Sequence, residues 1–111
     1  MKKTDISKIN KVIENLGWCM TEDDGEYELE KYSPAGQDFS INISANSLEE
    51  FSEKLNERYG TFDCSEEAYL WLDNTGHGKN GAPYDMKYVY EDMEACESML
   101  EELAMAIKEI I

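Results

Sequence analysis

The chain has 111 residues, the usual size of one domain with one hydrophobic core, so we expect a single domain over residues 1–111. Its 25 Asp and Glu residues outnumber its 10 Lys and Arg residues, which gives a net charge of −15. A surface this acidic repels nucleic acid and anionic membranes, so neither is expected as a direct ligand, and it attracts basic partners. Strong acidity can also serve solubility alone.

The charge is divided unevenly along the chain. Residues 1–11 contain four lysines and one acid and carry +3. Residues 12–111 therefore carry −18, which gives the whole chain its net charge of −15. Three cysteines without close spacing do not predict a disulfide framework. The longest apolar run is too short to span a membrane, and no signal-peptide core follows the first lysines. We therefore expect a cytoplasmic protein.

The first element in chain order is a helix over residues 4–17, because apolar residues recur at steps of three, four and three. These apolar residues are Ile6, Ile9, Ile13 and Leu16. Thr4 or Asp5 can cap the start of this helix, and Gly17 can provide the left-handed residue after its end.

Residues 18–45 predict a three-stranded antiparallel meander. The pair Asp24-Gly25 is a strong hairpin signal, because a type I′ turn needs positive φ at both central residues. Pro34-Ala35-Gly36 predicts the second turn. Apolar and polar residues alternate around both turns, most regularly over residues 38–45. One face of such a sheet is apolar and needs a cover.

Helices after the sheet are expected to provide that cover. A capping box from Ser47 to Glu50 opens the first of them, and a second box from Asp63 to Glu66 opens the next. The apolar run inside residues 68–73 also suits a strand, although we favour a helix there.

The last predicted helix begins after Asp85 and carries a heptad seam, with apolar residues spaced three and four apart in alternation. The seam consists of Met86, Val89, Met93, Cys96, Leu100, Leu103, Ile107 and Ile110. We expect it to cover the sheet, since the flanking positions lack the regular Glu/Lys pairing of a zipper. Homodimerisation through the seam is the alternative. The fold class is therefore α+β, with the order α-β-β-β-α-α-α.

A glycine pattern in residues 74–85 has the letters of a dinucleotide fingerprint, G-x-G-x-x-G, at Gly76, Gly78 and Gly81. That fingerprint needs a strand before the first glycine and a helix opening at the third. Here a helix is predicted before it, and Pro83 delays the next helix. We therefore interpret the loop as a connection between helices.

Other cofactor and catalytic patterns fail as well. A calcium loop around Gly25 would need acids at the positions of Met20 and Lys31. The three cysteines and His77 lack the short-range pairing of a zinc site. His77 is the single histidine and lies in the glycine loop, so no Ser or Cys has a predicted base beside it. We expect no metal, no cofactor and no enzymatic activity.

Two acidic groups remain as candidate contact surfaces, with tyrosines Tyr84 and Tyr88 as candidate anchors beside the second. The hairpin group is Asp23, Asp24, Glu26, Glu28 and Glu30. The helix group, expected off the apolar seam, is Glu91, Asp92, Glu94, Glu97, Glu101 and Glu102. Helical residues three or four apart have Cβ atoms about 5–6 Å apart, comparable to the several Å between phosphates of a DNA strand. Like charges at this spacing repel each other and destabilise a helix. We therefore interpret the pattern either as a contact surface for a basic partner or as a solvated face.

By size, charge and element order, the chain resembles the small acidic inhibitor proteins of bacterial mobile elements, in particular the DNA-mimicking anti-CRISPR proteins that block Cas9-type nucleases. Some of those are compact α-β-β-β-α-α domains, from which the additional C-terminal helix departs. The resemblance implies a cytoplasmic, cofactor-free protein that inhibits by stoichiometric binding through the hairpin acids or the helix from Glu91 to Glu102.

The leading hypothesis is therefore a non-enzymatic acidic binding module, a DNA mimic that inhibits a basic nucleic-acid-binding protein such as a Cas9-type nuclease. The alternative is a structural or assembly protein that dimerises or docks through its last helix.

Overall fold

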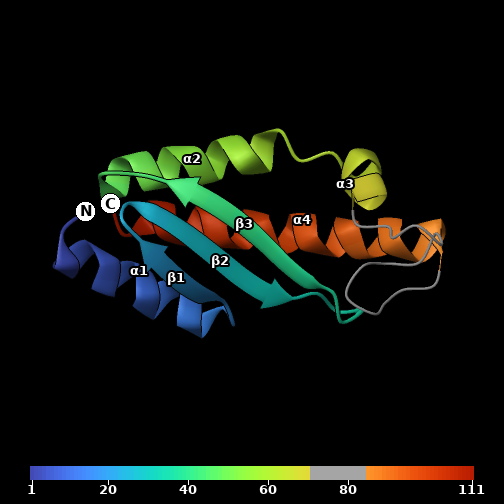
Figure 1. The fold of residues 1–111 in the computed structure, drawn as a ribbon, viewed down its shortest axis with the longest axis horizontal. Coiled ribbons are helices and arrows are strands. Elements are labelled where there is room, and N and C mark those ends of the chain that lie inside the picture. Colours follow the sequence, from blue (N-terminus) through green and yellow to red (C-terminus); the bar gives the residue numbers. More distant parts are fainter. Residues whose placement is uncertain (71–84) are drawn as a thin grey trace.

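The computed structural model is an α+β fold in the predicted order (Figure 1), and it describes residues 1–70 and 85–111. Its elements are α1 (Lys3–Asn15), β1 (Cys19–Asp23), β2 (Glu26–Tyr32), β3 (Asp38–Ser44), α2 (Leu48–Gly60), α3 (Cys64–Leu70) and α4 (Met86–Glu109). The three glycines of the G-x-G-x-x-G pattern lie outside the described residues. In the segment 68–73, for which we favour a helix over a strand, residues 68–70 are helical and residues 71–73 lie outside the described residues.

The strands form an antiparallel meander in the order β1-β2-β3, as predicted. Asp24 and Gly25 have φ values of 48° and 81°, so the β1–β2 turn has positive φ at both positions, as a type I′ turn requires. The central strand pairs on both sides, with Glu28 opposite Thr21 of β1 and Asn42 of β3. This register fixes which side chains share a face, because side chains alternate along each strand.

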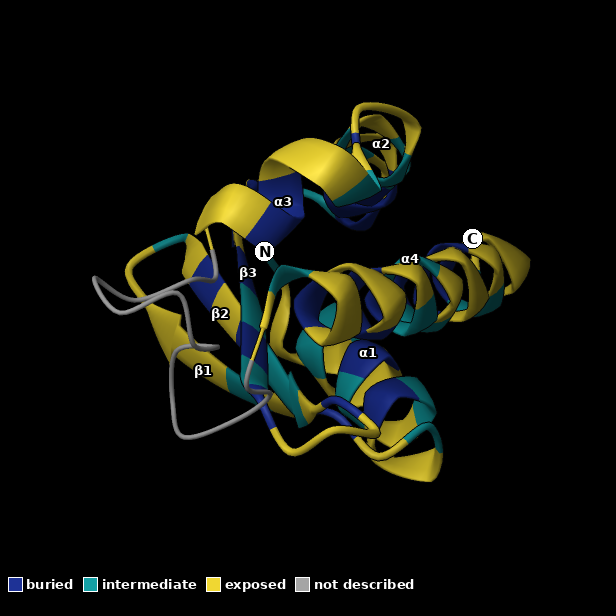
Figure 2. Cartoon of the chain, turned by 90° about the vertical axis from the view of Figure 1, so that its right-hand side faces the viewer, coloured by how far each residue is buried: buried dark blue, intermediate teal, exposed yellow. Residues whose placement is uncertain are grey.

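One face of the sheet is buried and carries the apolar residues of β2 and β3. Buried residues on this face are Tyr27, Leu29, Phe39, Ile41 and Ile43. Figure 2 shows the sheet on one side of the molecule and α1, α4 and α2 on the other, with α4 between α1 and α2. Since these helices all cover the same face, none of them covers the opposite face of the sheet.

The predicted caps of the later helices are confirmed. Ser47 Oγ accepts from the amide of Glu50 at 3.1 Å, and Asp85 Oδ1 accepts from the amide of Tyr88 at 3.2 Å. Asp63 likewise accepts from the first amides of α3. The predicted start of α1 is wrong. That helix begins at Lys3, before Thr4 and Asp5, and its first turn has no side-chain cap.

The heptad seam of α4 is buried inside the chain, as the covering interpretation predicted. Its fully buried members are Val89, Met93, Cys96, Leu100, Leu103 and Ile107. These side chains belong to the same hydrophobic core as the sheet residues and the apolar stripes of α1 and α2. A dimer would therefore need a surface other than the seam.

Replacing Leu100 by alanine tests the internal position of the seam. Leu100 has no exposed surface, so Leu100→Ala should lower the free energy of unfolding by about 2–5 kcal/mol. Urea unfolding at two protein concentrations measures this loss, which should not depend on concentration. Met105→Ala on the exposed side of the same helix is the control and should have little effect. A midpoint that rises with protein concentration would contradict an intramolecular seam.

Candidate functional site

The face of the sheet that the helices leave uncovered is here called the open face. It consists of Cys19, Thr21, Asp23, Glu26, Glu28, Glu30, Tyr32, Asp38, Ser40, Asn42 and Ser44. These side chains are exposed or half-buried. Five of them are carboxylates and none is a base. The charged residues of the open face are therefore all acidic.

The carboxylates of the open face have positions fixed by the backbone. Glu26, Glu28 and Glu30 alternate along the central strand, so they project from the same face at intervals of about 6.4–6.8 Å. Asp23 lies opposite Glu26 on β1, and Asp38 lies opposite Tyr32 on β3. Like charges directly opposite or next to each other destabilise a sheet. This acidic pattern therefore costs stability, as the helix pattern was expected to do.

The electrostatic effect of this crowding falls mainly on one residue. A hydrogen bond with Glu28 raises the pKa of Glu30 above its ordinary value, and the charges of Asp38 and Glu28 raise it further. Glu26 has a different partner, because Ser44 Oγ donates to its Oε1 atom at 2.8 Å across the β2–β3 pair. The face thus combines one carboxylate that has a hydroxyl partner, Glu26, with a pair, Glu28 and Glu30, that shares a hydrogen bond and is crowded by like charge.

A shallow depression of about 230 Å³ lies at the turn end of the open face. It is lined by Thr21, Asp23, Glu26, Tyr27, Glu28 and Asn42. Three of these residues are carboxylates, so a protruding cationic side chain is the complementary occupant.

The structure brings most of the predicted hairpin group together. Asp23, Glu26, Glu28 and Glu30 share the open face, and Asp24 is exposed in the adjoining turn. Sequence reasoning missed Tyr32 and Asp38 at the other end of this face. Tyr32 is 72% exposed. It lies an even number of residues after Glu26 on the same strand, and this alternation could have placed it on the same face.

The predicted helix group does not join this surface, because α4 lies on the covered side of the sheet (Figure 2). Glu91, Glu94 and Glu102 are exposed on α4, and Tyr88 is 49% exposed near its start. The helix and hairpin groups therefore face opposite sides of the molecule and cannot form one contact surface. Tyr84 lies outside the described residues.

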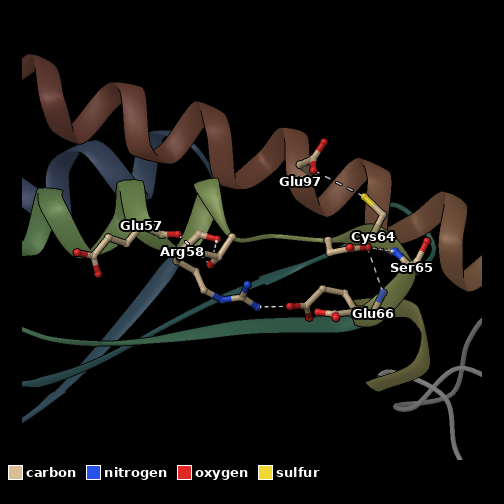
Figure 3. A network of polar contacts seen from close by, with 9 residues as sticks. Glu57, Arg58, Cys64, Ser65, Glu66 and Glu97 are labelled. Carbon is tan, nitrogen blue, oxygen red and sulfur yellow. Dashed lines mark hydrogen bonds and ion pairs between the residues drawn. The ribbon is translucent and has the colours of Figure 1, made fainter.

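Two further members of the helix group contact neighbouring helices. Glu101 accepts a hydrogen bond from the Tyr59 hydroxyl of α2. Glu97 lies 3.8 Å from the Cys64 sulfur of α3, as Figure 3 shows. The same view contains the ion pair that joins α2 to α3, in which Arg58 Nη2 lies 2.6 Å from Glu67 Oε1. Glu97 and Glu101 thus help to hold α2 and α3 against α4.

The expectation that Asp92 belongs to an exposed acidic face is wrong. Asp92 is only 4% exposed. Its carboxylate accepts hydrogen bonds from the Ser33 hydroxyl, from the Ala35 amide at 3.0 Å and from Gln37 Nε2 at 2.8 Å. A buried carboxylate is stable here because the β2–β3 connection directs these donors at it. Asp92 therefore fastens that connection to α4.

Two cysteines are held as neutral thiols. Burial, together with the charges of Glu97 and Glu94, raises the pKa of Cys64 to about 11. Burial also raises the pKa of Cys96, and the charge of Asp92 adds to this effect. Because the thiolate is the nucleophilic form, neither cysteine is activated at neutral pH.

Among residues 1–70 and 85–111, no group of three or more His, Cys, Asp or Glu side chains could hold a metal ion. Within the same residues, no helix is long and apolar enough to cross a membrane. Comparison with protein-family models, curated proteins and solved structures gives no match to this chain.

Asp92→Ala tests the anchoring role of the buried carboxylate. It leaves two buried side-chain donors and the part-buried Ala35 amide without their acceptor, so it should lower the free energy of unfolding by about 3–5 kcal/mol. Urea unfolding followed by circular dichroism measures the loss. Glu91→Ala, one residue earlier and exposed, is the matched control and should change stability little. Equal, small effects of both changes would contradict the anchor.

Glu28→Ala tests the crowding on the open face. It removes both the hydrogen bond and the nearest charge that raise the pKa of Glu30, so that pKa should fall toward its ordinary value. A carboxyl-carbon NMR titration measures the pKa of Glu30. Glu26→Ala is the control, and the pKa of Glu30 should stay raised in that variant. Because the folded-state pKa is raised, stability should fall as pH rises through the interval between the unfolded and folded pKa values of Glu30. An unchanged pKa in Glu28→Ala would contradict the coupling.

Proposed function

We propose that this chain is a non-enzymatic binding protein that presents the open face of its sheet to the basic surface of a nucleic-acid-binding protein. The observation that carries the proposal is the composition of that face, which has five carboxylates and no base. A solvated face needs no such segregation of charge. The charges of Asp38 and Glu28 are among the causes that raise the pKa of Glu30, after its hydrogen bond with Glu28, as expected where like charges are crowded. A cationic partner would relieve that repulsion.

The sheet suits a phosphate mimic better than α4 does. Its carboxylates stand on three paired strands whose backbone positions are fixed, which reduces the ordering that binding requires. Tyr32 adds a large, 72% exposed aromatic side chain at one end of the same face. Tyrosine is favoured at protein interfaces because it combines apolar area with a hydroxyl group. On α4, in contrast, Glu97, Glu101 and Asp92 already have partners within the chain.

The proposed mechanism is competition. Lysines and arginines that normally contact phosphates would bind the carboxylates of the open face, and the bound protein would exclude nucleic acid from the same groove. The inhibition would be stoichiometric and would weaken with salt, because exposed charge pairs are screened. A Cas9-type nuclease, which reads a short duplex motif with arginines and holds nucleic acid in a positive channel, is one partner of this kind.

The test measures displacement of a labelled DNA duplex from a panel of basic nucleic-acid-binding proteins, a Cas9-type nuclease among them. The protein should displace duplex from at least one member at a one-to-one ratio. The open-face variant Glu26→Gln, Glu28→Gln, Glu30→Gln should weaken that displacement at least about tenfold, because three charge pairs are lost at once.

The matched control removes the same number of charges from α4 through Glu91→Gln, Glu94→Gln and Glu102→Gln. It should leave displacement nearly unchanged. Equal weakening by the two triple variants would show that only net charge matters. No displacement from any member of the panel by the unaltered protein would refute the proposed inhibition of this class of partner.

A further inference from the structure

A second surface lies between α2 and the C-terminal end of α4, on the helical side of the molecule. Figure 1 shows these two segments at the same end of the fold. They border an open hollow of about 790 Å³, here called the α2–α4 groove. It is lined by Glu49, Ser52, Glu53, Asn56, Glu57, Lys108 and Ile111. None of these residues belongs to the open face.

One wall of the groove is a row of glutamates. Glu49, Glu53 and Glu57 are spaced four apart on α2, so they lie one above another at intervals of about 6 Å along the helix. All three are exposed, and none is in an ion pair within the described part of the chain. Like charges at this spacing destabilise a helix. Lys54 and Arg58, the bases of α2, line a second hollow beside β3, which Glu57 also lines, whereas Glu49 and Glu53 do not.

The groove also contains a hydroxyl group that has no hydrogen-bond partner within the described part of the chain. Ser52 lines it, is only 4% exposed, and its hydroxyl makes no hydrogen bond with the described residues. Among the described residues, the fully buried side-chain atom without a partner is Gln37 Oε1 and not Ser52 Oγ, so the Ser52 hydroxyl is accessible from the groove and a hydrogen-bonding group that enters the groove can bind it. This observation is independent of the glutamate row.

Apolar surface is exposed at the end of the groove. Ile111 lines the groove and is 56% exposed. Met105, which is 59% exposed, lies on α4 one turn before Lys108. It also lies one turn after Glu101, which accepts a hydrogen bond from Tyr59 of α2. The groove thus offers an acidic wall, the polar side chain of Ser52 and an apolar end, with Lys108 as the base among its lining residues.

We infer that the α2–α4 groove binds a basic amphipathic helix of a partner protein. Lysines or arginines four residues apart on that helix have the same rise of about 6 Å as the glutamate row, so they stay in register with it. An apolar side chain of the same helix would contact Ile111 and Met105. In the recurring helix-in-groove mode of peptide recognition, the apolar face of an amphipathic helix contacts apolar groove residues. Here Ile111 would provide that contact, and the basic face of the helix would meet the glutamate row.

Two other occupants fit the groove less well. An anionic ligand would meet the glutamate row at close range. A second copy of the chain would bring together two molecules that each carry −15. The inference does not rest on the proposed function, because it uses different carboxylates, which belong to α2 and not to the open face.

The probe is a fluorescein-labelled, alanine-based helical peptide with lysines four residues apart along one side and leucines beside them. A control peptide has the same composition, with its lysines distributed evenly around the helix. Fluorescence anisotropy at a fixed, moderate salt concentration measures both affinities. The patterned peptide should bind at least about tenfold more tightly than the control peptide.

The variant Glu49→Gln, Glu53→Gln, Glu57→Gln should weaken binding of the patterned peptide about tenfold. It keeps side-chain shape and removes like-charge repulsion, so the fold should be retained, which circular dichroism checks. The open-face variant Glu26→Gln, Glu28→Gln, Glu30→Gln removes the same charge and should leave peptide binding unchanged. Ile111→Ser should weaken it without changing net charge, as expected for the apolar end.

Equal weakening by both triple variants, or equal binding of both peptides, would overturn the inference in favour of nonspecific charge attraction. Self-association in sedimentation that the groove variant abolishes would assign the groove to a second copy and would also overturn it. Loss of peptide binding in the open-face variant alone would place the helix-binding site on the sheet. Each result can be distinguished from failure of the proposed function, which is measured by DNA displacement.

Discussion

A three-stranded sheet can bury only one of its faces when every helix that follows or precedes it packs on the same side, and this constraint organises the molecule. The pleat sends Tyr27, Leu29 and Phe39 into the core that α1, α2 and α4 cover. The same pleat must then send Glu26, Glu28 and Glu30 to solvent. The acidic open face and the apolar core are therefore two results of one register, which the β1–β2 turn with positive φ at Asp24 and Gly25 sets.

The acidity of the chain is divided by this arrangement into surfaces of different shape. On one side, a sheet holds carboxylates at fixed backbone positions, which suits a broad basic surface. Separately, the glutamate row of α2 borders the α2–α4 groove, for which we infer a single bound helix. Net charge alone would give one diffuse attraction to any cation. Under the proposed function and the inferred helix site, two geometrically distinct acidic surfaces would bind two partners, or two parts of one partner, separately.

Local patterns were sufficient for the elements, because turns, caps and periodicity depend on neighbours in the chain. The Asp24-Gly25 turn, the Ser47 cap and the seam of α4 all follow from such patterns. The role of Asp92 could not be predicted in this way, since its donors Ser33, Ala35 and Gln37 lie 55 to 59 residues away. The α2–α4 groove likewise exists only after two distant helices have packed together.

The most direct test of the central claim is to map where a cation binds on the free protein. Nona-arginine, a compact polycation, would be titrated into isotope-labelled protein, and amide shifts would be followed by NMR. The open-face proposal predicts the largest saturable shifts at Glu26, Glu28, Glu30 and Tyr32, with smaller shifts at the exposed acids of α4. Shifts spread evenly over all exposed acids, or concentrated at Glu91 and Glu94, would contradict it.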